Sequence, residues 1–231
     1  MRSQTITHSN EDFATAAPGI EVRELDIAAA TYGEYTLAVI RISPEGARVD
    51  ALHRHDERFS LAYVLKGWLD VEFQALGVEH LGPGTVVPAF NAPAHREIDA
   101  GDGLELLLLV TQKPMCDGEA EHIVLLRKDD APAAVEKQAC RDFGLETLSG
   151  GRISARALRA PGLLAQRDSS PDFHCAYIAS GWLELDQGSA STQRLQAGAA
   201  LVNQVDFGDR LRTCSDDLLV IEIETPAAQQ L

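Results

Sequence analysis

Phe59-Ser-Leu-Ala-Tyr63-Val-Leu-Lys-Gly67-Trp68-Leu-Asp-Val71 decides the fold, because it returns as Phe173-His-Cys-Ala-Tyr177-Ile-Ala-Ser-Gly181-Trp182-Leu-Glu-Leu185. The two copies start 173 − 59 = 114 residues apart, close to half of the 231-residue chain. The segment 104–114 likewise recurs as 218–226. A repeat this long indicates two tandem domains, since solenoid repeats have periods of about 20–50 residues.

Both copies have the sequence pattern of β-structure. Short runs rich in Val, Leu, Ile and Tyr alternate with Gly, Pro and Asp, which favours a sandwich or barrel over βαβ units. We predict a first domain over 1–114, a linker over 115–139 and a second domain over 140–231. The expected strands of the first domain are 35–42, 61–65, 68–73, 86–87 and 104–111. Within the linker, 122–126 is apolar enough to add a strand, and 131–138 is a candidate helix begun by a proline.

Composition limits the function classes. The net charge of −15 repels phosphate backbones, which disfavours nucleic-acid binding. No apolar run approaches the roughly 20 residues of a membrane span. The amino terminus has no apolar signal region, and the four cysteines form no CxxC pair. We therefore expect a cytoplasmic protein with reduced thiols.

Only the first copy carries a set of histidines. In an extended segment, His53 and His55 project from the same side, about 7 Å apart along the backbone. His95 follows a turn-and-strand segment that leads back across the same sheet, which makes it the candidate third ligand. At the 114-residue offset the second copy has Arg167 and Asp209 in place of His53 and His95.

These residues resemble the two cupin motifs. Gly46, His53, His55 and Gly67 match the first motif with one extra residue before His53, and Gly82, Pro88 and His95 match the second with two extra residues. Because the repeat covers both halves, the chain resembles a tandem bicupin of the RmlC-like type. The resemblance implies an all-β fold of two cupin barrels, each a double-stranded β-helix of jelly-roll type.

The resemblance also implies a divalent metal ion (Fe, Zn, Ni or Mn) bound by His53, His55 and His95. The chain departs from the family at Ser60, where the motif has a glutamate ligand. Three neutral imidazoles leave the full charge of +2 on the ion, which favours a small anionic, chelating ligand. Glu57 or Glu97 is the candidate replacement carboxylate. Glu97 shares strand parity with His95 and is the better candidate for fourth ligand or general base.

The second domain lacks this histidine set. We expect Arg167 and Asp209 to form an ion pair, together with His174 or Ser169, because buried charges require partners. The alternative is a pocket for a small anion centred on Arg167. The recurring tyrosines and tryptophans are expected to be scaffold residues, because they recur irrespective of the histidines.

The leading hypothesis is a metal-dependent enzyme acting on a small organic acid, as a dioxygenase, decarboxylase or isomerase; the resemblance favours iron. The alternatives are a non-catalytic small-molecule-binding or sensing protein, and a metal protein whose coordination is closed by Glu57 or Glu97. A homodimer is expected from the resemblance alone.

Overall fold

The computed structural model describes residues 5–7, 12–128, 139–159, 173–187, 191–203 and 210–225. These residues fall into two compact units. The amino-terminal unit comprises 11–28 and 32–131, and the carboxy-terminal unit comprises 1–10, 29–31 and 132–231. In the described part of the chain, no helix has the length and apolar character needed to cross a membrane.

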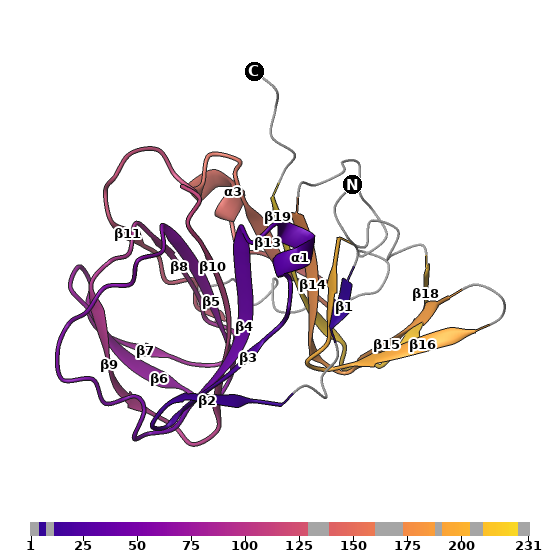
Figure 1. Cartoon of the computed structure of the whole chain (residues 1–231), viewed down its shortest axis with the longest axis horizontal. Coiled ribbons are helices and arrows are strands. Elements are labelled where there is room, and N and C mark those ends of the chain that lie inside the picture. Colours follow the sequence, from indigo (N-terminus) through magenta and orange to yellow (C-terminus); the bar gives the residue numbers. More distant parts are fainter. Residues whose placement is uncertain are drawn as a thin grey trace. The chain divides into compact units, whose positions relative to one another are not determined.

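Two antiparallel sheets build the amino-terminal unit (Figure 1). The seven-stranded sheet has the order β11-β8-β5-β10-β4-β3-β2, and the three-stranded sheet has the order β7-β6-β9. The strands are β2 (Ala14–Ala17), β3 (Ile20–Glu24), β4 (Tyr35–Ile42), β5 (Phe59–Lys66), β6 (Leu69–Phe73), β7 (Gly77–Leu81), β8 (Val86–Phe90), β9 (His95–Ala100), β10 (Leu104–Thr111) and β11 (His122–Ile123).

The carboxy-terminal unit repeats this arrangement with a six-stranded sheet, β1-β17-β14-β19-β13-β12, and a three-stranded sheet, β16-β15-β18. Its strands are β1 (Thr5–Thr7), β12 (Cys140–Asp142), β13 (Ser154–Leu158), β14 (Phe173–Ser180), β15 (Trp182–Asp186), β16 (Thr192–Gln196), β17 (Ala200–Val202), β18 (Leu211–Cys214) and β19 (Leu219–Thr225). The described helices are α1 (Ala28–Thr31) and α3 (Leu145–Leu148).

The chain is therefore almost wholly β, as predicted. The expected strands 35–42 and 104–111 are confirmed as β4 and β10. The expected strand in 122–126 is confirmed as β11, which pairs with β8. The helix expected over 131–138 lies outside the described residues. At the amino terminus, β1 pairs with β17 and forms the edge of the six-stranded sheet of the carboxy-terminal unit.

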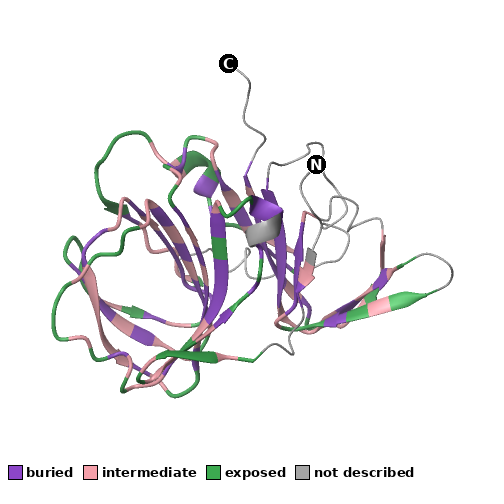
Figure 2. Cartoon of the chain, in the orientation of Figure 1, coloured by how far each residue is buried: buried purple, intermediate pink, exposed green. Residues whose placement is uncertain are grey.

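Each unit buries its core between its large and its small sheet (Figure 2). In the amino-terminal unit, alternate residues of β6 pack against Val64, Val87 and Leu106 of the large sheet. Both copies of the repeated stretch cross from one sheet to the other at a glycine with positive φ, Gly67 (69°) and Gly181 (74°). Glycine adopts this conformation without the steric cost that a Cβ imposes. The repeat therefore encodes a strand, a sharp turn and a strand of the opposite sheet.

Of the repeated aromatic residues, Tyr63 and Tyr177 are buried, as expected of scaffold residues. Trp68 and Trp182 are only half-buried. The ring of Trp68 lies 5.4 Å from that of His80, and the guanidinium of Arg194 stacks over Trp182 at 3.7 Å. Because His80 and Arg194 are exposed, the two tryptophans lie at the surface of their units and not in the buried core.

Candidate metal centre

A backbone bridge brings two of the histidines together. The amide of His53 donates to the carbonyl of His95 at 2.8 Å, and the amide of His95 donates to the carbonyl of His53 at 3.0 Å. His95 is the first residue of β9, whereas His53 and His55 precede β5 and form no regular strand. This antiparallel bridge therefore supplies the extended geometry that we expected of a strand.

The three imidazoles converge. Ring centroids are 4.9 Å apart for His53 and His55, 4.7 Å for His53 and His95, and 5.1 Å for His55 and His95. One nitrogen from each ring lies within 4.8 Å of the other two. The structure thus brings together the three residues that sequence spacing proposed as ligands, and imidazole nitrogen is a ligand of zinc, iron, nickel and copper alike.

The surroundings of His95 favour the form that binds metal. Its Nδ1 lies 3.0 Å from the carbonyl oxygen of Pro93. Because a carbonyl only accepts, Nδ1 carries the proton and Nε2 keeps its lone pair. Burial lowers the pKa of His95, and the neighbouring His55 and His53 lower it further, against the opposing effects of Pro93 and Glu97. The ring is therefore neutral near pH 7.

One ring nitrogen of His53 also lacks a hydrogen-bond partner in the part of the chain that the structure describes. Its Nδ1 is buried and has no hydrogen-bond partner among the described residues. A buried polar nitrogen without a partner is costly unless something else satisfies it. A divalent cation is one such partner, so the donor set fits a metal ion.

Glu97 lies against this cluster. Its Oε1 is 3.8 Å from His95 Nε2, and its Oε2 is 3.9 Å from His53 Nε2. Strand parity on β9 places Glu97 on the same side as His95. Glu57, the other candidate carboxylate, lines the adjoining cavity, as Glu97 does, but only Glu97 also lies within 4 Å of two of the rings. Of the two carboxylates, Glu97 is thus the one placed to contact an ion or take up a proton.

Two of the histidines, His55 and His95, line a cavity of about 280 Å³ inside the amino-terminal unit. Together with Glu57, Glu97 and Ser60 they make up its polar lining, the polar end of the cavity. Ser60, at the position of the motif glutamate, contributes a hydroxyl group rather than a ligand carboxylate. The rest of the wall is apolar and comes from both sheets.

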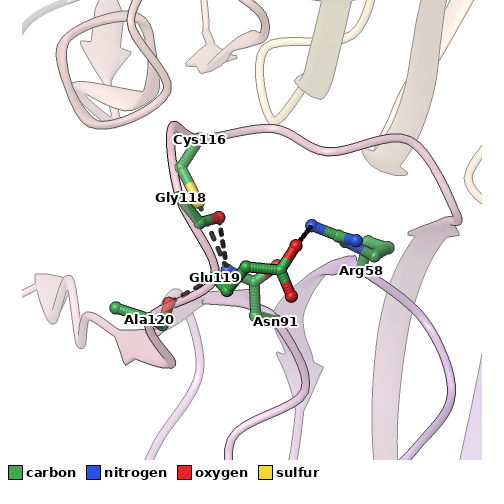
Figure 3. Close-up of polar contacts among 6 residues, drawn as sticks. All are labelled: Arg58, Asn91, Cys116, Gly118, Glu119 and Ala120. Atoms are coloured by element: carbon green, nitrogen blue, oxygen red, sulfur yellow. Dashed lines mark hydrogen bonds and ion pairs between the residues drawn. The ribbon is translucent and has the colours of Figure 1, made fainter.

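Sequence reasoning missed the residues that fix the turn before His95. Asn91 and Ala92 both have positive φ, 57° and 50°. The amide nitrogen of the Asn91 side chain donates to the carbonyls of Ala120 at 2.9 Å and Gly118 at 3.4 Å, and lies 3.6 Å from Cys116 Sγ (Figure 3). Asparagine tolerates this backbone region better than most residues. The sequence signal that could have identified this turn was an asparagine placed directly after a strand.

Ion pairs also connect segment 116–121 to the segment that carries His53 and His55. Glu119 pairs with Arg58 at 3.3 Å (Figure 3), and Glu121 pairs with Arg54. Arg54 also donates to the carbonyl of Ala92 at 3.0 Å. The loop thus joins the two segments that carry His53, His55 and His95.

In the carboxy-terminal unit, Arg167, Ser169 and Asp209 lie outside the described residues. His174 lies on β14 and is fully buried, as is Glu222 of β19. The Nε2 of His174 is 3.2 Å from Oε1 of Glu222, whose Oε2 accepts from Arg156 Nε at 2.5 Å. Sequence reasoning considered His174 as a further member of an ion pair between Arg167 and Asp209, which stays a prediction, and it missed Glu222 and Arg156 as partners of His174. The signal was an acidic residue within the apolar run Leu219-Val-Ile-Glu-Ile.

No family model and no curated protein matches the chain. Solved structures do match it. A putative glyoxylate-induced protein from Pseudomonas aeruginosa is 12% identical with a TM-score of 0.68, over 100% of this chain and 92% of that one. Bacterial pirin YhhW from Escherichia coli, in complex with nickel(II), is 11% identical with a TM-score of 0.66, over 98% and 100%.

A single-residue variant of oxalate decarboxylase from B. subtilis is 15% identical with a TM-score of 0.57, over 98% of this chain and 78% of that one. The fold is of the cupin type. At these identities the likeness carries the fold alone, and the chemistry must be argued from the residues of this chain.

Proposed function

We propose that the amino-terminal unit binds one divalent metal ion through His53, His55 and His95, and that it acts on a small organic acid. The observation that carries this proposal is the convergence of three imidazoles, with Glu97 within 4 Å of two of them, beside a cavity that His55, His95 and Glu97 line. The lowered pKa of His95 and the unpartnered Nδ1 of His53 support it.

The charges of the site favour an anionic ligand. Three neutral imidazoles leave the charge of +2 on the ion, and the carboxylate of Glu97 reduces the local charge to about +1. A bound ion would act as a Lewis acid towards the oxygens of an organic acid and hold it in place. Glu97, within 4 Å of two rings, is placed to be the fourth ligand or to move a proton. Dioxygenase, decarboxylase and isomerase reactions all use these two functions, and iron would add oxygen chemistry.

Metal analysis of matched variants tests the site. We expect close to one divalent ion per chain after loading and dialysis, and a loss of at least about tenfold in metal content in His53→Ala/His55→Ala. His80→Ala is the control, because His80 lies outside the cluster and pairs with Asp70 at 2.6 Å. Equal metal content in the double variant and the control would refute the assignment.

A non-catalytic binding protein is the second candidate. The largely apolar wall of the cavity favours it, because apolar side chains hold a ligand without taking part in proton transfer. Oxygen uptake, together with product analysis on the metal-loaded protein, separates the two candidates. Turnover that depends on Glu97 supports the enzyme, whereas tight binding without turnover supports the binding protein.

We also propose a domain type, an oligomeric state and a cellular location for the protein. These are two tandem cupin barrels of the RmlC-like type, a homodimer and a cytoplasmic location. The internal repeat supports the first. The four cysteines, which are all free thiols, fit a reducing compartment.

A further inference from the structure

Beyond its polar end, the cavity has a wall without positive charge. Among the described residues that line it there is no lysine or arginine. Isoleucine, leucine, valine, alanine and phenylalanine side chains form the deeper wall, including Ile40, Val71, Phe73, Leu106 and Leu108. Most of them belong to the hydrophobic core of the unit, which the cavity therefore enters.

A second anionic group on the ligand would lie in this apolar region. An unpaired carboxylate there loses its hydration without gaining a partner, which costs far more than burying a hydrocarbon group gains. Glu57 and Glu97 at the mouth of this region add repulsion. The cavity thus selects against dicarboxylates and phosphates.

The volume of the cavity limits the size of the apolar part of the ligand. A cavity of about 150 Å³ is enough to hold benzene, and this cavity measures about 280 Å³. Part of that volume holds the chelating head beside His55 and His95. The remainder admits a branched aliphatic or single-ring body of roughly six to ten carbons.

We infer that the ligand is a monoanionic oxygen chelator with an apolar body, of the kind represented by a 2-oxo acid carrying a phenyl or branched alkyl group. Its carboxylate and adjacent oxygen face the three histidines, and its hydrocarbon part fills the cavity between the two sheets. This inference rests on the proposed metal site, since the ion holds the chelating head.

Two 2-oxo acids of equal length test the charge argument. In 5-methyl-2-oxohexanoate an isopropyl group replaces the distal carboxylate of 2-oxoglutarate, and the chelating heads are identical. Nickel(II) is first titrated into the protein by calorimetry, and each acid is then titrated into the loaded protein. We expect the branched acid to bind at least about 100-fold more tightly than 2-oxoglutarate, and phenylpyruvate to bind about 10- to 100-fold more tightly than pyruvate.

Two variants locate the body of the ligand. Ala62 lines the cavity and lies opposite both Leu108 and Val87 in the sheet. Ala62→Leu should fill the cavity and weaken phenylpyruvate binding at least about tenfold, with nickel affinity unchanged. Ala16→Leu, the same change on an exposed position of β2, should change neither. If Ala62→Leu does not fold, Leu108→Ala replaces it, and enlarging the cavity should favour 2-oxo-4-phenylbutanoate over phenylpyruvate.

The outcomes separate the inference from the function on which it rests. A protein that takes up no nickel refutes both. A protein that takes up nickel but binds 2-oxoglutarate as tightly as its branched analogue keeps the metal site and overturns the ligand class. Unchanged phenylpyruvate binding in Ala62→Leu overturns the placement of the apolar body.

Discussion

Removal of Glu222 is the sharpest test of how the carboxy-terminal unit holds together. Glu222 is 1% exposed, and its two oxygens contact His174, which is 0% exposed, and Arg156, which is 33% exposed. Burial opposes ionisation of Arg156, but the nearby carboxylate of Glu222 outweighs it and raises the pKa of this residue. Glu222→Ala deletes both contacts and leaves the two partners in place.

The expected cost follows from the burial of each partner. Depriving a fully buried group such as His174 of a hydrogen-bond partner costs about 1–3 kcal/mol. The contact with Arg156 adds only about 0.5–1 kcal/mol, because a third of that side chain reaches solvent. We therefore expect Glu222→Ala to lower the free energy of unfolding of this unit by about 2–4 kcal/mol.

The amino-terminal unit offers a matched control. Glu105 lies directly opposite Arg41 on the neighbouring antiparallel strand, in the same way that Glu222 lies opposite Arg156. The arginine partner of Glu105, however, is 46% exposed. Glu105→Ala should cost no more than about 1 kcal/mol. The two sites share a cross-strand pair of glutamate and arginine, but the second partner of Glu105 is the exposed Lys66, whereas that of Glu222 is the buried His174.

Tryptophan fluorescence can follow the two units separately, because each contains one of the two tryptophans. In a Trp68→Phe background, Trp182 reports urea unfolding of the carboxy-terminal unit. A loss of about 2–4 kcal/mol should lower the midpoint by roughly 1–2 M. If Glu222→Ala destabilises its unit no more than Glu105→Ala destabilises the other, the reasoning from burial is wrong.

Three further predictions concern metal, pH and thiol reactivity. A divalent ion at 100 times its dissociation constant should stabilise the amino-terminal unit by about 2.7 kcal/mol, with Trp68 as the reporter; no shift would contradict a metal site there. Burial raises the pKa of Glu105, but hydrogen bonds from Lys66 and Arg41 outweigh this effect and hold the pKa below its usual value. The stability that Glu105 adds relative to Glu105→Gln should therefore be constant above about pH 5, and acid titrations should show it vanish as the pH falls through the lowered pKa. Burial raises the pKa of Cys175 to about 12, so it should resist thiol reagents in the native protein and react only after denaturation.

The sequence predicted those features that depend on local periodicity. Runs rich in apolar residues identified β4 and β10 with correct ends, because in each strand the apolar run extends over nearly the full length of the strand. The sequence-based prediction placed the start of β5 at Leu61, two residues late, although Phe59 is 0% exposed. The polar Ser60 interrupts the apolar pattern there, and it lines the cavity rather than solvent.

Contacts between segments far apart in the sequence could be predicted only in part. The spacing of His53 and His55 implied that both rings project from one side, and the return of the chain at His95 implied a third ring. The contacts of Asn91 with segment 116–121, in contrast, depend on where a loop crosses the end of a sheet. No periodicity in the sequence contains that information.

The repeat explains why the two units differ in their interiors. Ser60 and Leu108 line the cavity of the amino-terminal unit. At the 114-residue offset their counterparts are His174 and Glu222, and the strand pairing of Ala62 with Leu108 has its counterpart in that of Ala176 with Glu222. In the second copy these two side chains are long and polar enough to contact each other within the buried interior. The same pair of positions thus lines a cavity in one unit and forms a buried hydrogen-bonded pair in the other.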